Sequence, residues 1–275
     1  MAITIYHASD LHFGSSLTSQ SIALLAHIFA GHFRDSGAFL LVTGDITDDG
    51  SAEQYELAAR HLRPFAGRLL ACPGNHDVGP QGNLYSPEAV QRYHEQIDPL
   101  TVLAGDGTDH LPHDILLQDG EGCQVLTVGL NSTLYTPTPF DFACGQVGDE
   151  QRLALQAKLC QASLCRPRGG PVPTLVYLHH RPFRFPFLTS MVMRLRDADR
   201  FLDIVEASAD VVAFGHSGSS LDVRRRHGEK NHSTLEHFTT WLDANAAPIN
   251  GAYFKAVFGE PGSRPQISTV CMWAP

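Results

Sequence analysis

The sequence lacks any hydrophobic run that approaches the roughly 20 residues of a membrane-spanning helix, so we expect no membrane partner. It also lacks a basic segment followed by an apolar one at its start, and we therefore expect no signal peptide. Its six cysteines show none of the close spacings that bind zinc or form a redox pair. Together these absences predict a cytoplasmic protein with reduced thiols.

The sequence has few positively charged residues. Its 275 residues contain 20 Lys and Arg but 29 Asp and Glu, which gives a formal net charge of −9. This balance disfavours nucleic acid as a partner, although bound divalent cations would still allow a phosphate-containing substrate. The composition is that of an ordinary globular protein, 43% hydrophobic and 18% charged, and no repeat, low-complexity segment or linker interrupts it. We therefore expect a single domain over residues 1–275.

What the sequence does contain is one pattern repeated five times, a short apolar run that ends in Asp, Asn or His. The central run is Phe39–Thr43, after which Gly44 lets the chain turn into Asp45 and Asp48. The other runs end at Asp10-Leu11-His12, Asn75-His76, His179-His180 and Gly215-His216. One Gly-Asp after a strand is often only a turn, but five such strand ends are hard to explain by packing. Carboxylate, amide and imidazole groups without thiolates favour Mn, Fe, Zn or Co.

Helices and further strands separate these runs. We expect helices over residues 21–34, 52–62, 87–100, 149–165 and 197–207, a hairpin over 114–129, and late strands over 252–258 and 266–272. Ser51 and Gln54 fit a capping box at the start of the second helix, and Ser86 with Pro87 fits the start of the third. Alternating strands and helices followed by strand-rich segments predict a layered α/β domain with more than one sheet.

The strand-end motifs, taken in order and spacing, resemble those of the calcineurin-like metallophosphoesterase family. The similarity is greatest to its small bacterial phosphodiesterases of cyclic nucleotides and glycerophosphodiesters. The resemblance runs from Ile3 to Ser217 and includes Gly145–Gln151 before a predicted helix. It implies an α/β fold, a layered β-sandwich flanked by helices, with two divalent metal ions on the loops at one end.

The resemblance also implies a ligand set. One metal ion would be held by Asp10, His12 and Asp45, and the other by Asp45, Asn75, His179 and His216, so that Asp45 bridges the two. Two cations bridged in this way can bind one phosphate and lower the pKa of a bound water, which then supplies a hydroxide for in-line attack on phosphorus.

Four further residues are expected around the metal ions. By the resemblance, His76 is no ligand but lies over the phosphate, where it stabilises the transition state or protonates the leaving group, and Asp48 orients it. The bland alternative for His76 is a loop histidine that caps a turn. Asn75, His76, His180 and Arg181 are expected substrate contacts, and for His180 a purely structural place is as well supported as a place in the pocket.

Three other polar residues are expected to be structural. His7 lies within the first apolar run and is predicted to be a core histidine. Asp49 and Asp77 are predicted to cap or solvate their loops.

The sequence departs from the family at Gly218, where a second His is usual after Gly-His. Glycine offers no side-chain ligand, so we expect weak occupancy of the site formed by Asp10, His12 and Asp45. Water, Ser219 or Asp222 are the candidates to complete that site.

Hydrolysis of a small-molecule phosphodiester is therefore the leading hypothesis. A nuclease of the same family is an alternative that the acidic charge disfavours. A binding or scaffold protein with a decayed metal centre is another; Gly218 favours it, whereas the presence of His76 with Asp48 argues against it. The aromatic segment Phe183–Phe187 fits a lip, a partner surface or a buried loop equally, and it leaves a homo-oligomer open.

Overall fold

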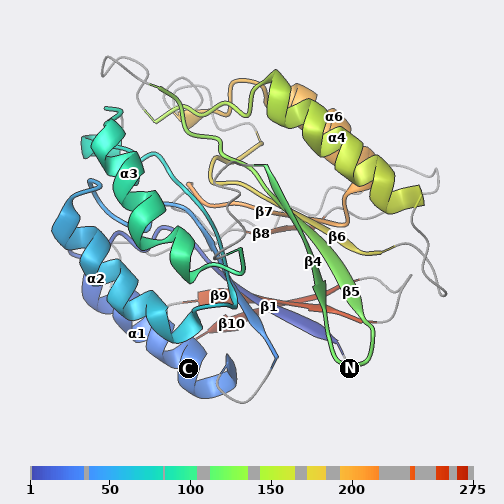
Figure 1. Cartoon of the computed structure of the whole chain (residues 1–275), viewed down its shortest axis with the longest axis horizontal. Helices are drawn as coiled ribbons and strands as arrows, with labels where there is room; N and C mark the ends of the chain where they lie inside the picture. Colours follow the sequence, from blue (N-terminus) through green and yellow to red (C-terminus); the bar gives the residue numbers. More distant parts are fainter. Residues whose placement is uncertain are drawn as a thin grey trace.

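Two five-stranded sheets packed face to face form the centre of the molecule in the computed structural model (Figure 1). The structure describes residues 2–33, 37–82, 84–103, 112–135, 143–164, 172–183, 193–216, 236–238, 252–259 and 265–271. In order across the first sheet the strands are β10 (Gln266–Cys271), β9 (Ala252–Phe258), β1 (Ile3–Ala8), β2 (Phe39–Thr43) and β3 (Leu69–Cys72). The second sheet has β4 (His113–Gln118), β5 (Gln124–Gly129), β6 (Thr174–Tyr177), β7 (Val211–Ala213) and β8 (Glu236–Phe238).

Helices cover the outer face of each sheet (Figure 1). The helices on the side of the first sheet are α1 (Thr18–Ile28), α2 (Ala52–Leu62) and α3 (Pro87–Gln96), and those on the second are α4 (Asp149–Leu164) and α6 (Ala198–Ser208). Short helical turns follow α1, α2 and α3 at Phe29–Phe33, Arg63–Phe65 and Asp98–Leu100, and another lies at Pro80–Gly82. The predicted layered β-sandwich flanked by helices is confirmed.

The side-chain alternation of β2 explains why the chain stacks in these layers. Leu40 and Val42 point outward into a cluster with Leu24 of α1 and Tyr55 of α2. Leu41 points the other way and joins the cluster between the two sheets. A strand that is buried on both faces has to be apolar throughout, which is why Phe39–Thr43 reads as a continuous hydrophobic run.

The direction of the strands decides where the polar strand ends meet. β1, β2 and β3 are parallel, and so are β5, β6 and β7. Because parallel strands end at the same edge of a sheet, the loops after β1, β2 and β3 lie together. The loops after β6 and β7 come from the facing sheet, and hydrogen bonds join the two groups of loops, for example from His216 N–H to the Asp10 carboxylate and from His179 Nδ1 to the Thr43 carbonyl.

Several local expectations are confirmed and two need correction. The hairpin of β4 and β5 and the cap of α3 are as predicted, with Ser86 Oγ accepting a hydrogen bond from Ala89 N–H. The first helix begins at Thr18, three residues earlier than expected, and passes at Phe29 into a π-helical turn. The capping box of α2 is wrong, because Ser51 makes no side-chain cap and Gln54 instead accepts from the N–H groups of the preceding loop.

Two broader expectations concern the whole chain. Among the described residues, no helix combines the length and apolar character needed to cross a bilayer. The single domain over residues 1–275 stays a prediction.

Candidate metal centre

The predicted ligands come together at the strand ends. Within the part of the chain that the structure describes, three groups of potential ligand atoms each lie within 4.8 Å of one another. These groups are Asp10, His12 and Asp45; Asp45, His179 and His216; and His12, Asp48 and His76. Asp45 belongs to two of them, which is the place expected of a bridging carboxylate.

The backbone at these residues is held in an uncommon conformation. Asp10, His12, Asp45 and His216 have positive φ angles of 54°, 44°, 50° and 66°, and Gln81 is the one other non-glycine residue of the described chain with a positive φ. Left-handed backbone is unfavourable for residues with a side chain and persists where the surrounding structure enforces it. Four of the six predicted metal ligands therefore carry backbone strain, as residues at functional sites often do.

Glycine is required where the loop after β2 lies against the facing sheet. Gly44 has a φ of 81°, and a Cβ atom there would lie 2.6 Å from Nδ1 of His179 and 2.7 Å from the backbone nitrogen of Gly74. Since real Cβ atoms essentially never approach other atoms so closely, only glycine lets the loop after β2 lie against the histidine of the opposite sheet.

His179 lies at the centre of the more buried group. Its Nδ1 lies 2.8 Å from the main-chain carbonyl oxygen of Thr43, to which it can donate a hydrogen bond. Its Nε2 lies 3.1 Å from Oδ1 of Asn75, 3.1 Å from Nδ1 of His216 and 3.3 Å from Oδ2 of Asp45. The side chain of His179 is fully buried, and these distances are too short for a water molecule to lie between the atoms.

This arrangement fits a cation. Asn75 donates its Nδ2 to the carbonyl oxygen of Gly82 at 2.8 Å, so its Oδ1 is the atom that faces His179. With Nδ1 of His179 donating to Thr43, Nε2 of a neutral ring is an acceptor and so are Asn75 Oδ1 and Asp45 Oδ2. Buried acceptors that face one another without a donor repel, and a divalent metal ion or a proton between them removes the repulsion.

The pKa shifts of His179 and Asp45 also indicate that this group of residues needs a positive charge. Burial alone would lower the pKa of His179, but the neighbouring Asp45 carboxylate, with Asp10 and the Thr43 carbonyl, outweighs burial and raises that pKa to about 9. Burial would likewise raise the pKa of Asp45, yet the imidazoles of His179, His76 and His12 hold it well below its usual range. Without a metal ion, a proton on His179 supplies the positive charge that the group needs.

The second group joins Asp10, His12 and Asp45. The Asp10 carboxylate accepts a hydrogen bond from the backbone N–H of His216, 3.2 Å away, and so ties β1 to β7. His12 Nε2 lies 3.7 Å from Oδ2 of Asp45, and its Nδ1 lies 3.1 Å from Oδ1 of Asp48. A carboxylate on the far nitrogen of an imidazole is the usual support of a metal-ligating histidine.

His76 stands at the edge of the centre and is partly exposed. Its backbone N–H donates to Oδ1 of Asp45 at 3.0 Å, and its Nδ1 lies 2.7 Å from the main-chain carbonyl oxygen of Asp48. The Asp48 carboxylate instead faces His12, so Asp48 contacts the two histidines through different atoms. Burial lowers the pKa of His76, but the Asp45 charge and the Asp48 carbonyl raise it by more, with a net upward shift.

His180 and Arg181 follow His179 directly in the chain, and His180 belongs to none of the three groups of potential ligands. His180 is fully buried, its ring centroid is 4.4 Å from that of His216, and its Nδ1 lies 2.8 Å from Oγ of Ser132. Arg181 is 8% exposed. The substrate contacts predicted for these two residues stay predictions. Sequence reasoning missed Ser132, because a lone serine in a long loop carries no distinguishing pattern.

Asp77 joins the loops after β2 and β3, which fits its predicted capping role. Its buried carboxylate accepts from the N–H groups of Ile46, Thr47 and Gly74 at 2.8–3.1 Å. Asp49 caps its own loop, accepting from Ser51 N–H at 3.0 Å. His7 is a core histidine as expected, buried with its Nε2 2.7 Å from Oγ1 of Thr43.

Several predictions fall outside the described residues. These are Gly218 and its suggested substitutes Ser219 and Asp222, and the part of the aromatic segment beyond Phe183. Phe183 itself packs against Phe214, with ring centroids 5.7 Å apart.

Comparison with known proteins decides the family. Residues 3–219 match the model of the calcineurin-like phosphoesterases. The chain belongs to this family. It is 26% identical over 236 residues to the 3′,5′-cyclic adenosine monophosphate phosphodiesterase CpdA of Vibrio vulnificus, an alignment that covers 82% of this chain and 73% of that protein. The resemblance expected from the sequence is confirmed, and this calcineurin-like phosphoesterase is a hydrolase of phosphoesters.

Solved structures of low sequence identity share the fold. A purple acid phosphatase from yellow lupin aligns with a TM-score of 0.67 and 9% identity, over 99% of this chain and 52% of that one. A putative 5′-nucleotidase from Staphylococcus aureus aligns with a TM-score of 0.60 and 14% identity, over 97% and 54%. This chain thus spans about half the length of both. A dimetal phosphatase from Danio rerio aligns over 98% of this chain and 99% of that one, with a TM-score of 0.60 and 12% identity.

Proposed function

We propose that this phosphoesterase hydrolyses small-molecule phosphodiesters, either a cyclic nucleotide or a glycerophosphodiester, with the help of two divalent metal ions. The observation that carries the proposal is the convergence of His179 Nε2, Asn75 Oδ1 and Asp45 Oδ2 within 3.3 Å in a buried position, with His76 beside them. The similarity to a cyclic adenosine monophosphate phosphodiesterase supports the diester as substrate.

The chain offers two sets of ligands. Asp10, His12 and Asp45 would hold one cation, and Asp45, Asn75, His179 and His216 would hold the other. Oxygen and imidazole ligands of this kind suit Mn, Fe, Zn or Co. When bound, the two cations would supply the charge that binds the phosphate and the activated water that hydrolysis needs.

His76 would provide the proton for the leaving group. Its Nδ1 can donate to the Asp48 carbonyl, and in the metal-free chain that carbonyl and the Asp45 charge raise the pKa of the ring. A protonated imidazole fixed in this way is suited to act as a general acid toward the departing oxygen. The backbone N–H of His76 donates to Asp45, which fixes the loop of the general acid to the bridging carboxylate.

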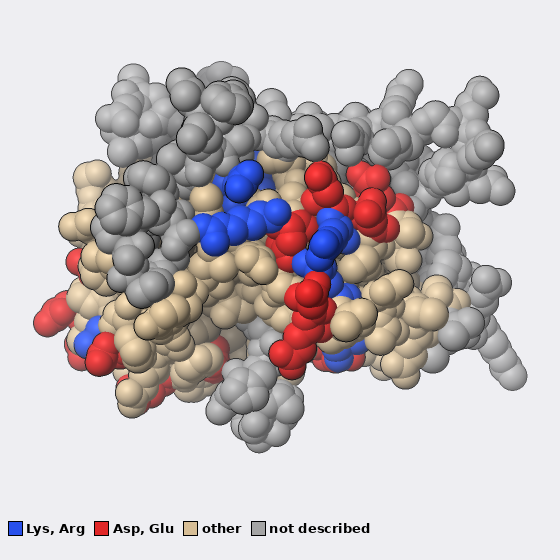
Figure 2. Space-filling view, turned by 90° about the horizontal axis from the view of Figure 1, so that it is seen from above, with Lys and Arg blue, Asp and Glu red and all other residues tan. Residues whose placement is uncertain are grey.

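The surface charge disfavours the nuclease alternative. On the face seen in Figure 2, the described Lys and Arg side chains lie among Asp and Glu side chains near the middle and form no continuous basic strip. With a net charge of −9, long-range attraction of a polynucleotide is not expected.

The proposal is tested by metal content and turnover together. After reconstitution with Mn²⁺, elemental mass spectrometry should find metal bound to the chain, and bis(p-nitrophenyl) phosphate and cyclic AMP should be hydrolysed faster than p-nitrophenyl phosphate. His76→Asn should keep the metal and lower kcat by about 10²- to 10⁴-fold. His27→Asn, on α1 and outside the three groups of potential ligands, is the matched control and should leave kcat unchanged.

The outcomes separate the hypotheses. A chain that binds metal but hydrolyses only the monoester would disprove the diesterase. A chain that binds no metal would favour the scaffold alternative. Arg181→Gln should raise KM with little change in kcat if Arg181 contacts the substrate, and an unchanged KM would remove it from the site.

A further inference from the structure

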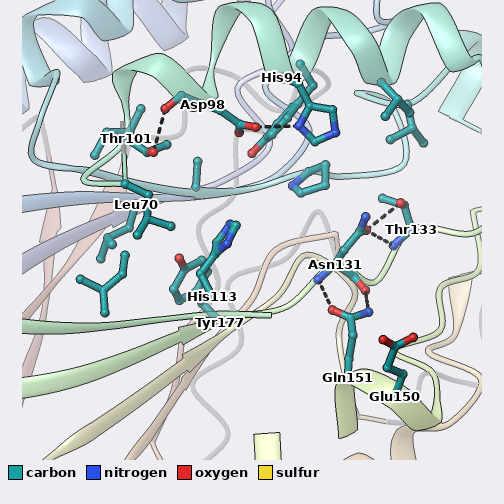
Figure 3. Close-up of a pocket in the computed structure, with 18 of the residues that line it drawn as sticks. Leu70, His94, Asp98, Thr101, His113, Asn131, Thr133, Glu150, Gln151 and Tyr177 are labelled. Carbon is teal, nitrogen blue, oxygen red and sulfur yellow. Dashed lines mark hydrogen bonds and ion pairs between the residues drawn. The ribbon is translucent and has the colours of Figure 1, made fainter. Parts of the chain in front are cut away.

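A cavity that none of the predicted metal ligands lines is found where the sandwich opens between its two edge strands β3 and β4 (Figure 3). Helix α3 contributes Val90, Tyr93 and His94 to its wall, and β6 contributes Tyr177. Its volume is about 400 Å³, within the range of small-molecule sites. None of the predicted metal ligands lines it, and neither does His76.

Two tyrosine hydroxyls in this cavity need a partner. Tyr93 is 5% exposed and Tyr177 is 1% exposed, and neither hydroxyl has a hydrogen-bond partner among the described residues. Buried tyrosine hydroxyls usually find one. Burial raises the pKa of both phenols, so each keeps its proton and is available as a donor.

The two tyrosines belong to different walls of the cavity. Tyr93 is on α3 and Tyr177 is at the end of β6, and both line the cavity. In Figure 3 Tyr177 rises from β6 into the space below α3. A molecule in the cavity would thus have a hydroxyl donor on each of two walls.

The charges around the cavity select against anions. Asp98 and Glu150 are among its lining residues, and no described Lys or Arg is. Asp98 Oδ2 accepts from Nδ1 of His94 at 2.6 Å (Figure 3). The rest of the wall combines apolar residues, with Leu70 and Pro73 on the side of β3, and uncharged polar residues such as Asn131 and Thr133.

We propose that this cavity is a second ligand site, and that it binds a flat, uncharged heteroaromatic molecule of the nucleobase kind. The ring lies against the apolar and aromatic walls, its acceptor atoms take the hydroxyl hydrogens of Tyr93 and Tyr177, and its amino group faces the carboxylate of Asp98. A phosphate group on the same molecule has no cationic side chain to meet.

The position of the site connects it to the metal centre. Pro73 and Val78 line the cavity and flank the loop that carries Asn75 and His76. Asn131 and Thr133 also line it, and the residue between them, Ser132, bonds to His180 beside the ligands. The loop after β3 and the loop that holds Ser132 therefore each have residues that line the cavity and residues at the candidate metal centre. A ligand in the cavity should for this reason change the rate of hydrolysis.

Binding is tested directly on the metal-loaded full chain with adenine and adenosine as probes, by isothermal titration calorimetry. We expect saturable binding at millimolar or lower concentration. Tyr177→Phe and Tyr93→Phe should each weaken it about fivefold, the effect of one hydrogen bond. Val90→Trp should fill the cavity and abolish binding, whereas Gln91→Trp, the exposed neighbour on α3, should not change it.

Two results would overturn the proposal. Neither probe binding at millimolar concentration would mean that the cavity holds water only. Binding that is unchanged in both Tyr→Phe variants and in Val90→Trp would place the probe elsewhere, for example at the metal centre. Thermal unfolding of each variant checks that the fold is kept, and the two Tyr→Phe changes remain decisive if the larger Trp disturbs it.

Discussion

Nδ1 of His12 lies 3.1 Å from Oδ1 of Asp48, whereas the hydrogen bond between His76 and Asp48 involves the main-chain carbonyl oxygen of Asp48. The carboxylate of Asp48 therefore supports a proposed metal ligand by a direct contact, and its backbone supports the proposed general acid. A side-chain substitution at this position removes the first contact and leaves the second in place.

We accordingly expect Asp48→Ala to weaken one metal site more than it disturbs His76. Loss of such a supporting carboxylate costs typically 10- to 100-fold in metal affinity. Calorimetric titration with Mn²⁺ should show the site of His12 weakened while the other keeps its affinity, and saturating metal should restore most of kcat. Asp49→Ala, which removes only a cap on Ser51, is the control. If kcat stays low at saturating metal, the carboxylate acts on His76 after all.

Metal binding should release a proton from His179. The metal-free pKa of this ring is raised to about 9, while a metal ion needs Nε2 without its proton. Below pH 9 the metal ion must displace that proton, so apparent affinity should rise up to tenfold per pH unit from neutral pH and level off above about pH 9. Titrations in two buffers of different ionisation enthalpy measure the protons released. An affinity independent of pH between 7 and 9 would contradict this.

The strand ends could be predicted from the sequence because they leave a side-chain pattern. Asp45 and His179 stand directly after apolar runs, and parallel strands bring such ends to one edge. The groups that hold these residues in place leave no such pattern in the sequence. His179 is fixed by the carbonyl oxygen of Thr43 and Asn75 by that of Gly82, and every residue has a carbonyl. For the same reason the sequence could place Asp48 beside His76 but not say which of its atoms makes the contact.

The cavity between β3 and β4 could not be predicted from the sequence either. Tyr93 and Tyr177 stand at ordinary core positions, on the buried face of a helix and at the end of a strand. Only the packing of α3 over the edges of the two sheets brings their hydroxyls toward one cavity.

Gly82 should be required for activity, because it lies against the side chains of Asn75 and His76, the proposed metal ligand and general acid. A Cβ atom there would lie 2.5 Å from Nε2 of His76 and 2.7 Å from Nδ2 of Asn75. Gly82→Ala should therefore displace both and lower kcat at least tenfold. Gly67→Ala is the matched control: Gly67 also has a positive φ, 74° against 67°, but nothing lies within 4 Å of its added Cβ. Both variants should lose about 1 kcal/mol of unfolding free energy, and only Gly82→Ala should lose activity.

The last prediction rests on the sequence, since Gly218 lies outside the described residues. Asp10, His12 and Asp45 offer one cation two carboxylates and one imidazole, and Asp45 is shared with the neighbouring site. Gly218→His would add the imidazole that the family usually has at this position. Elemental mass spectrometry after reconstitution and removal of loose ions should then find a stoichiometry closer to two per chain than in the natural sequence. Gly218→Ala, which adds no ligand, should leave the stoichiometry as it is. Equal metal content in all three proteins would mean that another group already completes the site.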